Sequence, residues 1–252
     1  RKESSAASDV YKRQVMMIFG VIGCLVFFFC FFNTKERVNT YSEKVSLKAN
    51  ISCLLHNTPW KLFALNIVWF FGGYVIQAGA VIYYFTYVVG NESLVQVVAT
   101  ITTLVPIIAN LCAPFLVKLT SKRNLMTIGN IVHSLGLLLI FFGGTNVPVL
   151  LTAAVIAAAG YGLKISMHFA MQPDPVDYGE WKSGVNTAGT LSAVNGFIGK
   201  LGMAIASSLG AALLAFGGFD ADLAVQTATA QNYIAAMYIW VCLLYTSPSP
   251  RD

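Results

Sequence analysis

The chain has 252 residues, of which 56% are hydrophobic and only 11% are charged. Soluble domains carry about 25% charged residues, so this composition excludes an ordinary soluble globular protein. The formal net charge is +5, but most of the basic residues stand in the tails or in connections between apolar segments, where membrane topology accounts for them, so nucleic-acid binding is not indicated. The sequence therefore predicts an all-α polytopic membrane protein.

Seven apolar segments follow one another along the chain, most of them long enough to cross a hydrocarbon core of roughly 30 Å as a helix. They cover residues 15–32, 60–89, 94–117, 124–143, 147–172, 186–216 and 230–244, of which the first and last are expected to be truncated. Residues 1–14 and 245–252 resemble translated sequencing-adapter read-through and are predicted to be non-native tails. On that interpretation the chain is an internal fragment of a longer protein.

Basic residues alternate between successive connections. The 33–59 connection and the turn at 118–123 are rich in Lys and Arg, whereas the turns at 90–93 and 143–148 contain none. Because cytoplasmic loops carry the excess of Lys and Arg, 33–59 is predicted to be a cytoplasmic central loop. The turn at 118–123 and the acidic cluster at 174–182 are predicted to lie on the same side.

The 60–89 segment offers chemistry for sugar recognition. Asn66, Gln77 and Tyr84 recur at multiples of helical spacing. They combine amides that bond hydroxyl groups with an aromatic face on which a pyranose can stack. These three residues are predicted to line a substrate cavity, with ordinary helix packing as the alternative.

Lys164 lies within the apolar segment 147–172, on the same face as Tyr161 and His168. It either faces a cavity, where its charge would attract the carboxylate of an acidic sugar, or it supplies a counter-charge for Asp174. Another face consists of small residues suited to close helix contact, namely Ala154, Ala158, Gly162, Ser166 and Ala170.

The stretch from Asp174 to Gly184 places three acids and a lysine between two apolar segments. A carboxylate near the hydrocarbon boundary is costly unless it is paired or hydrated, so Asp174, Asp177 and Glu180 are expected to meet basic partners on other loops. In a carrier whose two bundles rock about a central site, such ion pairs form in one state and break in the other. With Lys182, these acids are predicted to form a cytoplasmic gate. A solvated loop is the alternative.

Lys200 lies midway along the 186–216 segment, where an ammonium costs about 2.5 to 3.5 kcal/mol unless it meets a carboxylate or a water-filled cavity. A snorkelling lysine fits this depth poorly. Helical spacing places it in a stripe of small or polar residues typical of a cavity lining: Asn186, Gly189, Ala193, Gly196, Lys200 and Ser207. A separate row suited to helix contact consists of Gly202, Ala206 and Gly210.

Two motifs carry a family resemblance. The run from Asp174 to Val185 (DPVDYGEWKSGV), followed by KLG at 200–202, is similar to the glycoside-pentoside-hexuronide:cation symporters, the melibiose-carrier family of the major facilitator superfamily. Supporting motifs are KERV at 35–38, YYFTY at 83–87 and LVK at 116–118. Because this family has twelve spans, the resemblance implies that 15–32 is the end of the sixth helix and that 60–244 is a C-terminal six-helix bundle.

The resemblance implies secondary active transport. A glycoside, pentoside or hexuronide would be carried together with a sodium ion or a proton by alternating access, across a bacterial-type plasma membrane. Lys200 would couple the cation and sugar sites, with Gly196 in the same cavity wall. The cation-binding aspartates would belong to a missing N-terminal half, so neither a cofactor nor metal ligands are expected in this chain. The implied partners are the sugar, the lipid bilayer and that missing half.

One position departs from the family pattern, because Asn186 stands where relatives commonly have an arginine. An asparagine cannot form a charge-assisted bidentate pair, so the expected gate is weaker.

Enzymatic motifs are absent from the sequence. His56, His133 and His168 show no metal-ligand spacing, and the chain contains neither a Walker A loop nor a GxSxG elbow. We expect His133 to be a buried, hydrogen-bonded histidine rather than a ligand. The chain is therefore predicted not to be an enzyme, and a membrane-embedded sensor or enzyme on the same helical scaffold is the alternative.

Overall fold

The computed structural model describes residues 2–34, 47–184, 186–223, 225–241 and 243. The chain divides into two compact units, Arg1–Glu43 and Lys44–Asp252. The first unit holds α1 (Lys2–Asn33), whose stretch Arg13–Asn33 is long and apolar enough to span a membrane. This helix includes residues 2–14, for which the sequence predicted a non-native tail.

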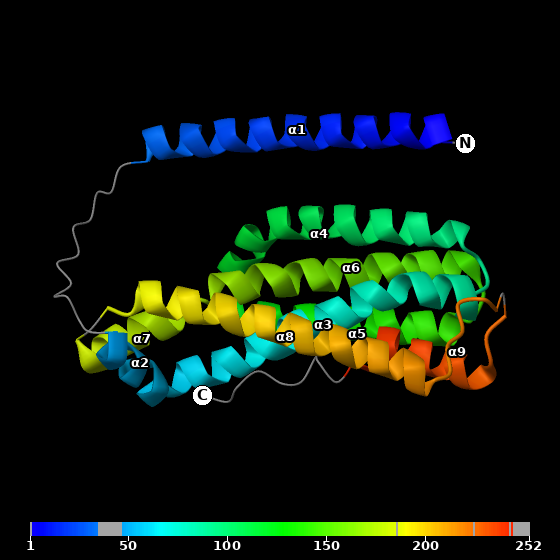
Figure 1. Ribbon diagram of the computed structural model, residues 1–252. Coiled ribbons are helices and arrows are strands. Elements are labelled where there is room, and N and C mark those ends of the chain that lie inside the picture. Colours follow the sequence, from blue (N-terminus) through cyan, green and yellow to red (C-terminus); the bar gives the residue numbers. More distant parts are fainter. Residues whose placement is uncertain (1, 35–46, 185, 224, 242, 244–252) are drawn as a thin grey trace. The chain divides into compact units, whose positions relative to one another are not determined.

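The second unit is helical in all its described elements (Figure 1). In chain order these are α2 (Leu47–His56), α3 (Thr58–Tyr83), η1 (Tyr84–Val88), α4 (Ser93–Leu119), α5 (Lys122–Gly143), α6 (Val147–Ala170), α7 (Asp174–Ser183), α8 (Ala188–Phe216), α9 (Ala228–Ala235) and η2 (Ala236–Trp240), where η marks a π-helical segment. Among the described residues of both units, six helices are long and apolar enough to cross a membrane, α1 included. The prediction of an all-α polytopic membrane protein is confirmed.

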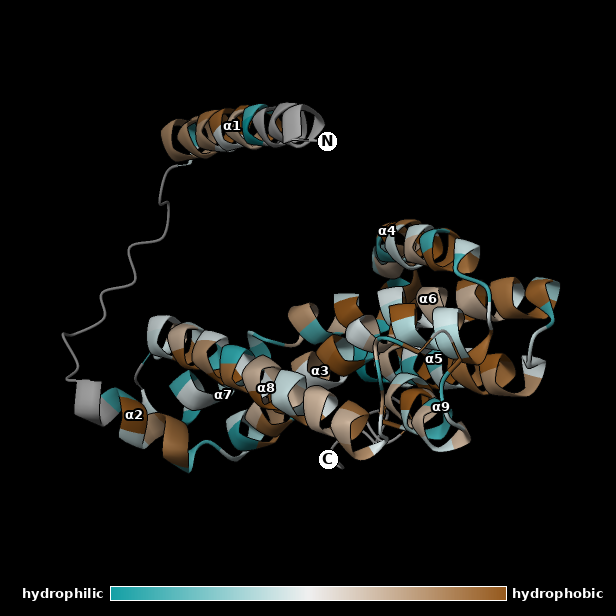
Figure 2. Cartoon of the chain, turned by 45° about the vertical axis from the view of Figure 1, so that its right-hand side comes forward, coloured by the Kyte–Doolittle hydropathy of each residue, from teal (hydrophilic) through white to brown (hydrophobic). Residues whose placement is uncertain are grey.

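Two short helices lie where the sequence predicted connections. The predicted central loop 33–59 contains α2, whose apolar residues recur at helical spacing and bury Leu54 against Trp60 and Leu191. The acidic stretch forms α7, where hydrophilic residues gather (Figure 2). This helix has a proline in its first turn and ends at Ser183, before Gly184, whose φ of 69° favours glycine.

Small residues set the spacing between helices. Helix α6 packs between α4 and α5, and α3 packs along α8 (Figure 1). A Cβ added at Gly129 would lie 2.9 Å from the backbone nitrogen of Lys164, and one added at Gly162 would lie 2.7 Å from the Ala109 Cβ. At the α3–α8 contact, a Cβ on Gly202 would lie 3.1 Å from the Val68 Cα. Lipid tails are as apolar as leucine side chains, so the hydrophobic effect does not drive helices together inside a membrane. Close backbone approach of this kind holds them together instead, through van der Waals packing.

The predicted row of small residues is confirmed on α8 and in part on α6, where Ala170 at the end of the row is exposed. The row Gly202, Ala206 and Gly210 on α8 is buried. On α6, Ala154, Ala158 and Gly162 are buried as well, and the Ser166 hydroxyl donates to the Asn110 side chain of α4. Close packing and one polar contact therefore fix α6 at the centre of its layer.

The two π-helical segments meet at one end of this unit. Tyr84 of η1 stacks on Tyr238 of η2 with ring centroids 4.8 Å apart. The Gln231 side-chain amide of α9 donates to the Tyr87 carbonyl at 3.1 Å. Single-turn π-helical distortions often lie at functional sites, and here they direct Tyr238 toward the cavity described below.

Candidate functional site

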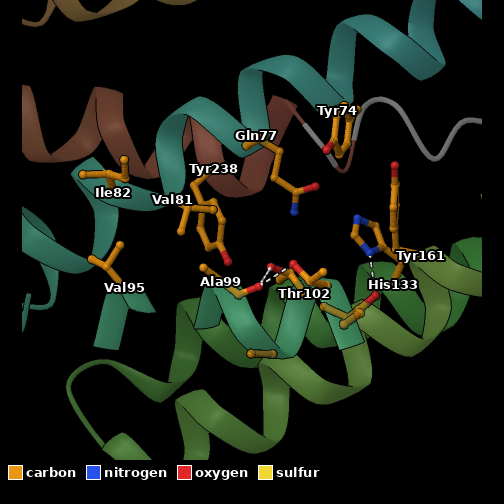
Figure 3. Close-up of a pocket in the computed structure, with 15 residues that line it drawn as sticks. Tyr74, Gln77, Val81, Ile82, Val95, Ala99, Thr102, His133, Tyr161 and Tyr238 are labelled. Atoms are coloured by element: carbon orange, nitrogen blue, oxygen red, sulfur yellow. Dashed lines mark hydrogen bonds between the residues drawn. The ribbon is translucent and has the colours of Figure 1, made fainter. Parts of the chain in front are cut away.

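A cavity of about 350 Å³ opens between α3, α4, α5, α6 and η2 (Figure 3). Its wall is largely apolar, with alanines and valines from α3, α4 and α6. The polar groups of the wall are those of Tyr74, Gln77, Thr102, Thr103, His133, Tyr161 and Tyr238. A mostly apolar concavity with a few convergent polar groups is the usual form of a small-molecule site.

Helix α3 supplies one side of the cavity. Tyr74 and Gln77 are three residues apart, so they lie on the same helical face. The Tyr74 ring stacks on Tyr161 of α6 with centroids 5.7 Å apart and planes 15° apart. Figure 3 shows the Gln77 amide reaching into the space beside these rings. The site therefore pairs an amide, which both donates and accepts hydrogen bonds, with flat aromatic faces.

Helices α4 and α5 supply further polar atoms. The Thr102 and Thr103 hydroxyls donate to carbonyls of their own helix, at 2.9 Å to Val98 and 2.8 Å to Ala99. His133 Nδ1 lies 2.8 Å from the Ala157 carbonyl, and because a carbonyl only accepts, Nδ1 carries the hydrogen in this contact. The expectation of a buried, hydrogen-bonded His133 is confirmed.

Of the residues predicted to line a cavity, Gln77 does so. Tyr84 is buried in the core at 3% exposure, and it is Tyr238, stacked on it, that reaches the cavity. Asn66 accepts a hydrogen bond from His168 Nδ1 at 3.0 Å, at a position outside the cavity wall. Helical spacing correctly grouped Asn66 and Gln77 on one face of α3, but neighbouring helices give them different partners.

Lys164, which was also predicted to face the cavity, is not part of its wall; it is 2% exposed and lies among aromatic side chains. Its Nζ stands 5.4 Å from the ring centroid of Tyr161 and 5.8 Å from that of Phe70. Such cation–π contacts stabilise an ammonium inside a protein. The ion pair of Asp174 is formed with Lys122, which takes the counter-charge role considered for Lys164.

The charged rim consists of α7 with two residues that contact its acids, Lys122 of α5 and Asn186, which precedes α8. Lys122 Nζ lies 2.8 Å from Asp174 Oδ1 and also donates to the Ala170 carbonyl at 3.2 Å. The two side chains are 44% and 49% exposed, so the pair contributes at most about 1 kcal/mol to stability and can open at little cost. The basic partner comes from the predicted basic turn at 118–123.

The other acids of the rim line a groove of about 410 Å³ between α6, α7 and α8. Glu180 accepts a hydrogen bond of 2.9 Å from the Asn186 amide, so the asparagine at the family's arginine position does contact the acidic cluster. Asp177 is exposed beside it. Lys182 is exposed, and its ammonium lies 5.9 Å from the Tyr178 ring centroid.

The structure does not bring Lys200 and Gly196 to this cavity. Both are exposed on α8, and a Cβ added at Gly196 would have no neighbour within 4 Å. The buried row at Gly202 and Ala206 turns the opposite way, toward α3. Lys200 therefore lies on a surface that the other described residues of this unit leave uncovered.

A buried cluster at the start of α3 was not identified from the sequence. Asn57 caps α3 by accepting from the Trp60 amide at 3.0 Å, and its own amide donates to the Pro175 carbonyl at 2.7 Å. Trp60 Nε1 donates to Asn195 at 3.0 Å. The run Asn-Thr-Pro before an apolar segment is a helix-start signal that could have revealed the cap. The distant partners on α7 and α8 carry no local signal.

Fold and cavity together define a helical membrane protein with a largely apolar cavity among its spans. Among the described residues, no group of His, Cys, Asp and Glu is arranged to hold a metal ion. A family profile described as MFS/sugar transport protein matches residues 6–246. The chain belongs to this sugar-transport family of the major facilitator superfamily, among the glycoside-pentoside-hexuronide:cation symporters.

Individual relatives agree with this assignment. An isoprimeverose transporter of Lactiplantibacillus pentosus is 32% identical over 90% of this chain and 48% of its own length. A glucuronide carrier protein homolog of Escherichia coli is 28% identical over 84% of the chain and 46% of its own length. A symporter of Bacillus subtilis is 31% identical over 81% of the chain and 44% of its own length. These relatives are transporters and not enzymes, and the chain spans about half of their length.

Proposed function

We propose that the protein containing this chain is a cation-coupled symporter that binds a sugar or glycoside in the cavity between α3, α4 and α6. The observation that carries the proposal is the pairing of the Gln77 amide with the stacked rings of Tyr74 and Tyr161. A pyranose ring has apolar C–H faces that pack on aromatic rings and equatorial hydroxyls that bond amides. The volume of about 350 Å³ is within the range of small-molecule sites.

The charged rim is proposed to act as the cytoplasmic gate. In alternating access, one bundle rocks against the other about a central site, and rim contacts exchange between the two states. The Asp174–Lys122 pair is exposed and weak, which suits a contact that must break in each cycle. Asp177, Glu180 and Lys182 are available beside it for basic or acidic groups of the other half.

Coupling is proposed to require the uncovered face of α8. Lys200 and Gly196 lie on this face. Once the other half of the transporter covers it, Lys200 would lie near the cation and sugar sites and compete with or replace the coupling ion, sodium or a proton. A lone ammonium at this depth is costly against lipid, so a polar or acidic partner surface is the stable arrangement. The protein is proposed to lie in a bacterial plasma membrane with the basic connections in the cytoplasm.

The test is uptake of labelled glycosides into proteoliposomes that hold the complete transporter. We expect accumulation that depends on a sodium or proton gradient and is lost when the gradient is collapsed. Substrate-dependent conformational change with no movement of any glycoside, under either gradient, would instead favour a membrane-embedded sensor.

A further inference from the structure

The position of Lys164 sets it apart from the other charged residues of the first four spans in this bundle. Every other Asp, Glu, Lys or Arg between Thr58 and Ala170 stands near a helix end or in a turn. Lys164 instead lies inside α6 at 2% exposure. Burying an ammonium in the membrane is costly, so a lysine at this depth indicates a function.

Aromatic rings hold the Lys164 charge next to the cavity. Its Nζ lies 5.4 Å from the centre of the Tyr161 ring and 5.8 Å from that of Phe70. Tyr161 in turn forms part of the cavity wall (Figure 3). The rings stabilise the ammonium through their quadrupoles but carry no net charge themselves, so its field extends through them.

This field reaches the bound substrate with little screening. Little water surrounds the Lys164 ammonium, because the lysine and the neighbouring Phe70 and His168 are all 2% exposed, and the Tyr161 ring stands between it and the cavity. Charges in such an environment interact far more strongly than they do in water. Apart from His133, no residue of the cavity wall is ionisable near neutral pH, and the wall contains no acidic side chain.

We propose that Lys164 makes the cavity select glycosides that carry a carboxylate, as on a hexuronic acid ring, over the neutral sugar of the same shape. Lys164 acts as a positioning residue, because its charge acts across Tyr161 and it does not line the cavity itself. The carboxylate lies beside Tyr161 and His133, on the side of the cavity nearest α6. This inference rests on the proposed function, since the cavity must be the sugar site.

The test compares two substrates that differ only at C6, methyl glucoside and methyl glucuronide, in proteoliposomes with the complete transporter. The wild-type protein is expected to take up the glucuronide in preference. Lys164→Met is expected to lower the ratio of glucuronide to glucoside uptake about tenfold or more, and Lys164→Arg, which keeps the charge, is expected to retain most of it. A merely structural role would lower both uptakes together and leave their ratio unchanged.

The outcomes separate this inference from the proposed function. Equal ratios in wild type and Lys164→Met overturn the role of Lys164 but leave sugar transport standing. A wild-type protein that prefers the neutral glucoside overturns it too, and this measurement needs no variant to fold. If the wild-type protein moves no glycoside under any gradient, the proposed function fails and the inference fails with it.

Discussion

Single polar residues of this chain take their roles from the helix that packs against them. Asn66 and Gln77 are both amides on one face of α3, yet Asn66 accepts a hydrogen bond from His168 while Gln77 faces the cavity. The difference arises from α6, which presents His168 at one level and Tyr161 at another. Gln77 is therefore the residue of α3 best placed to bond a substrate hydroxyl.

Replacing Gln77 tests that role. Gln77→Leu removes a donor and an acceptor at nearly constant volume, so the substrate concentration for half-maximal uptake should rise about tenfold, equivalent to ~1.4 kcal/mol. The matched control is Gln96→Leu, the same change at an exposed position of α4 outside the cavity wall, which should leave uptake unchanged. Equal effects of the two changes would contradict the assignment of the cavity.

A second prediction about single residues concerns the ion pair between Asp174 and Lys122. Because both side chains are about half exposed, Asp174→Asn should change the free energy of unfolding by less than about 1 kcal/mol. The uptake rate should nevertheless fall if the pair stabilises one state of the gate. The doubly exchanged variant, Lys122→Asp with Asp174→Lys, should recover part of the rate. No recovery, with single and double variants equally impaired, would argue against a pairwise role.

At the scale of elements, glycines decide how closely the helices approach. Gly136 and Gly160 lie at the α5–α6 contact, where an added Cβ would overlap backbone atoms of Ala157 and His133. This contact also places the Ala157 carbonyl in reach of His133 Nδ1. The shape of the cavity wall formed by α5 and α6 therefore depends on residues that carry no side chain.

A valine at this contact should be poorly tolerated. Gly160→Val should lower the free energy of unfolding by about 1 to 3 kcal/mol or more, because the backbones of α5 and α6 would have to separate. Gly79→Val is the matched control, since a Cβ at Gly79 has no neighbour within 4 Å, and it should change stability by less than about 0.5 kcal/mol. Thermal unfolding in detergent measures both. Similar stabilities would show that the helices can separate without cost.

At the scale of the whole molecule, α8 carries a stripe of small and polar residues that the other described residues of its unit do not cover. Gly189, Ala193, Gly196 and Lys200 are exposed along α8, and the relatives extend over about twice the length of this chain. A stripe of small and polar residues with a lysine is unsuited to contact with lipid. A second bundle, as in the family's two-half architecture, would cover it.

Transport should therefore require more than this chain. Residues 15–244 expressed alone should insert into membranes but accumulate no glycoside above the level of empty vesicles. Expression of the complete transporter in the same vesicles provides the positive control. Gradient-dependent accumulation by 15–244 alone would show that one bundle suffices and would refute the proposed role of the uncovered stripe.

Composition, apolar segment lengths and the DPVDYGEWKSGV run were enough to predict the membrane class, the helical spans and the family, because each depends on residues close in sequence. The rows of small residues on α6 and α8 were predictable for the same reason. The cavity was not, since its wall combines Gln77, Tyr161 and Tyr238 from helices far apart in the chain. Only tertiary packing decided that Asp174 pairs with Lys122, that Tyr84 is core, and that Lys164 lies behind an aromatic ring at the cavity. Helical periodicity determines which face a side chain occupies, whereas the neighbouring helix determines what that face meets.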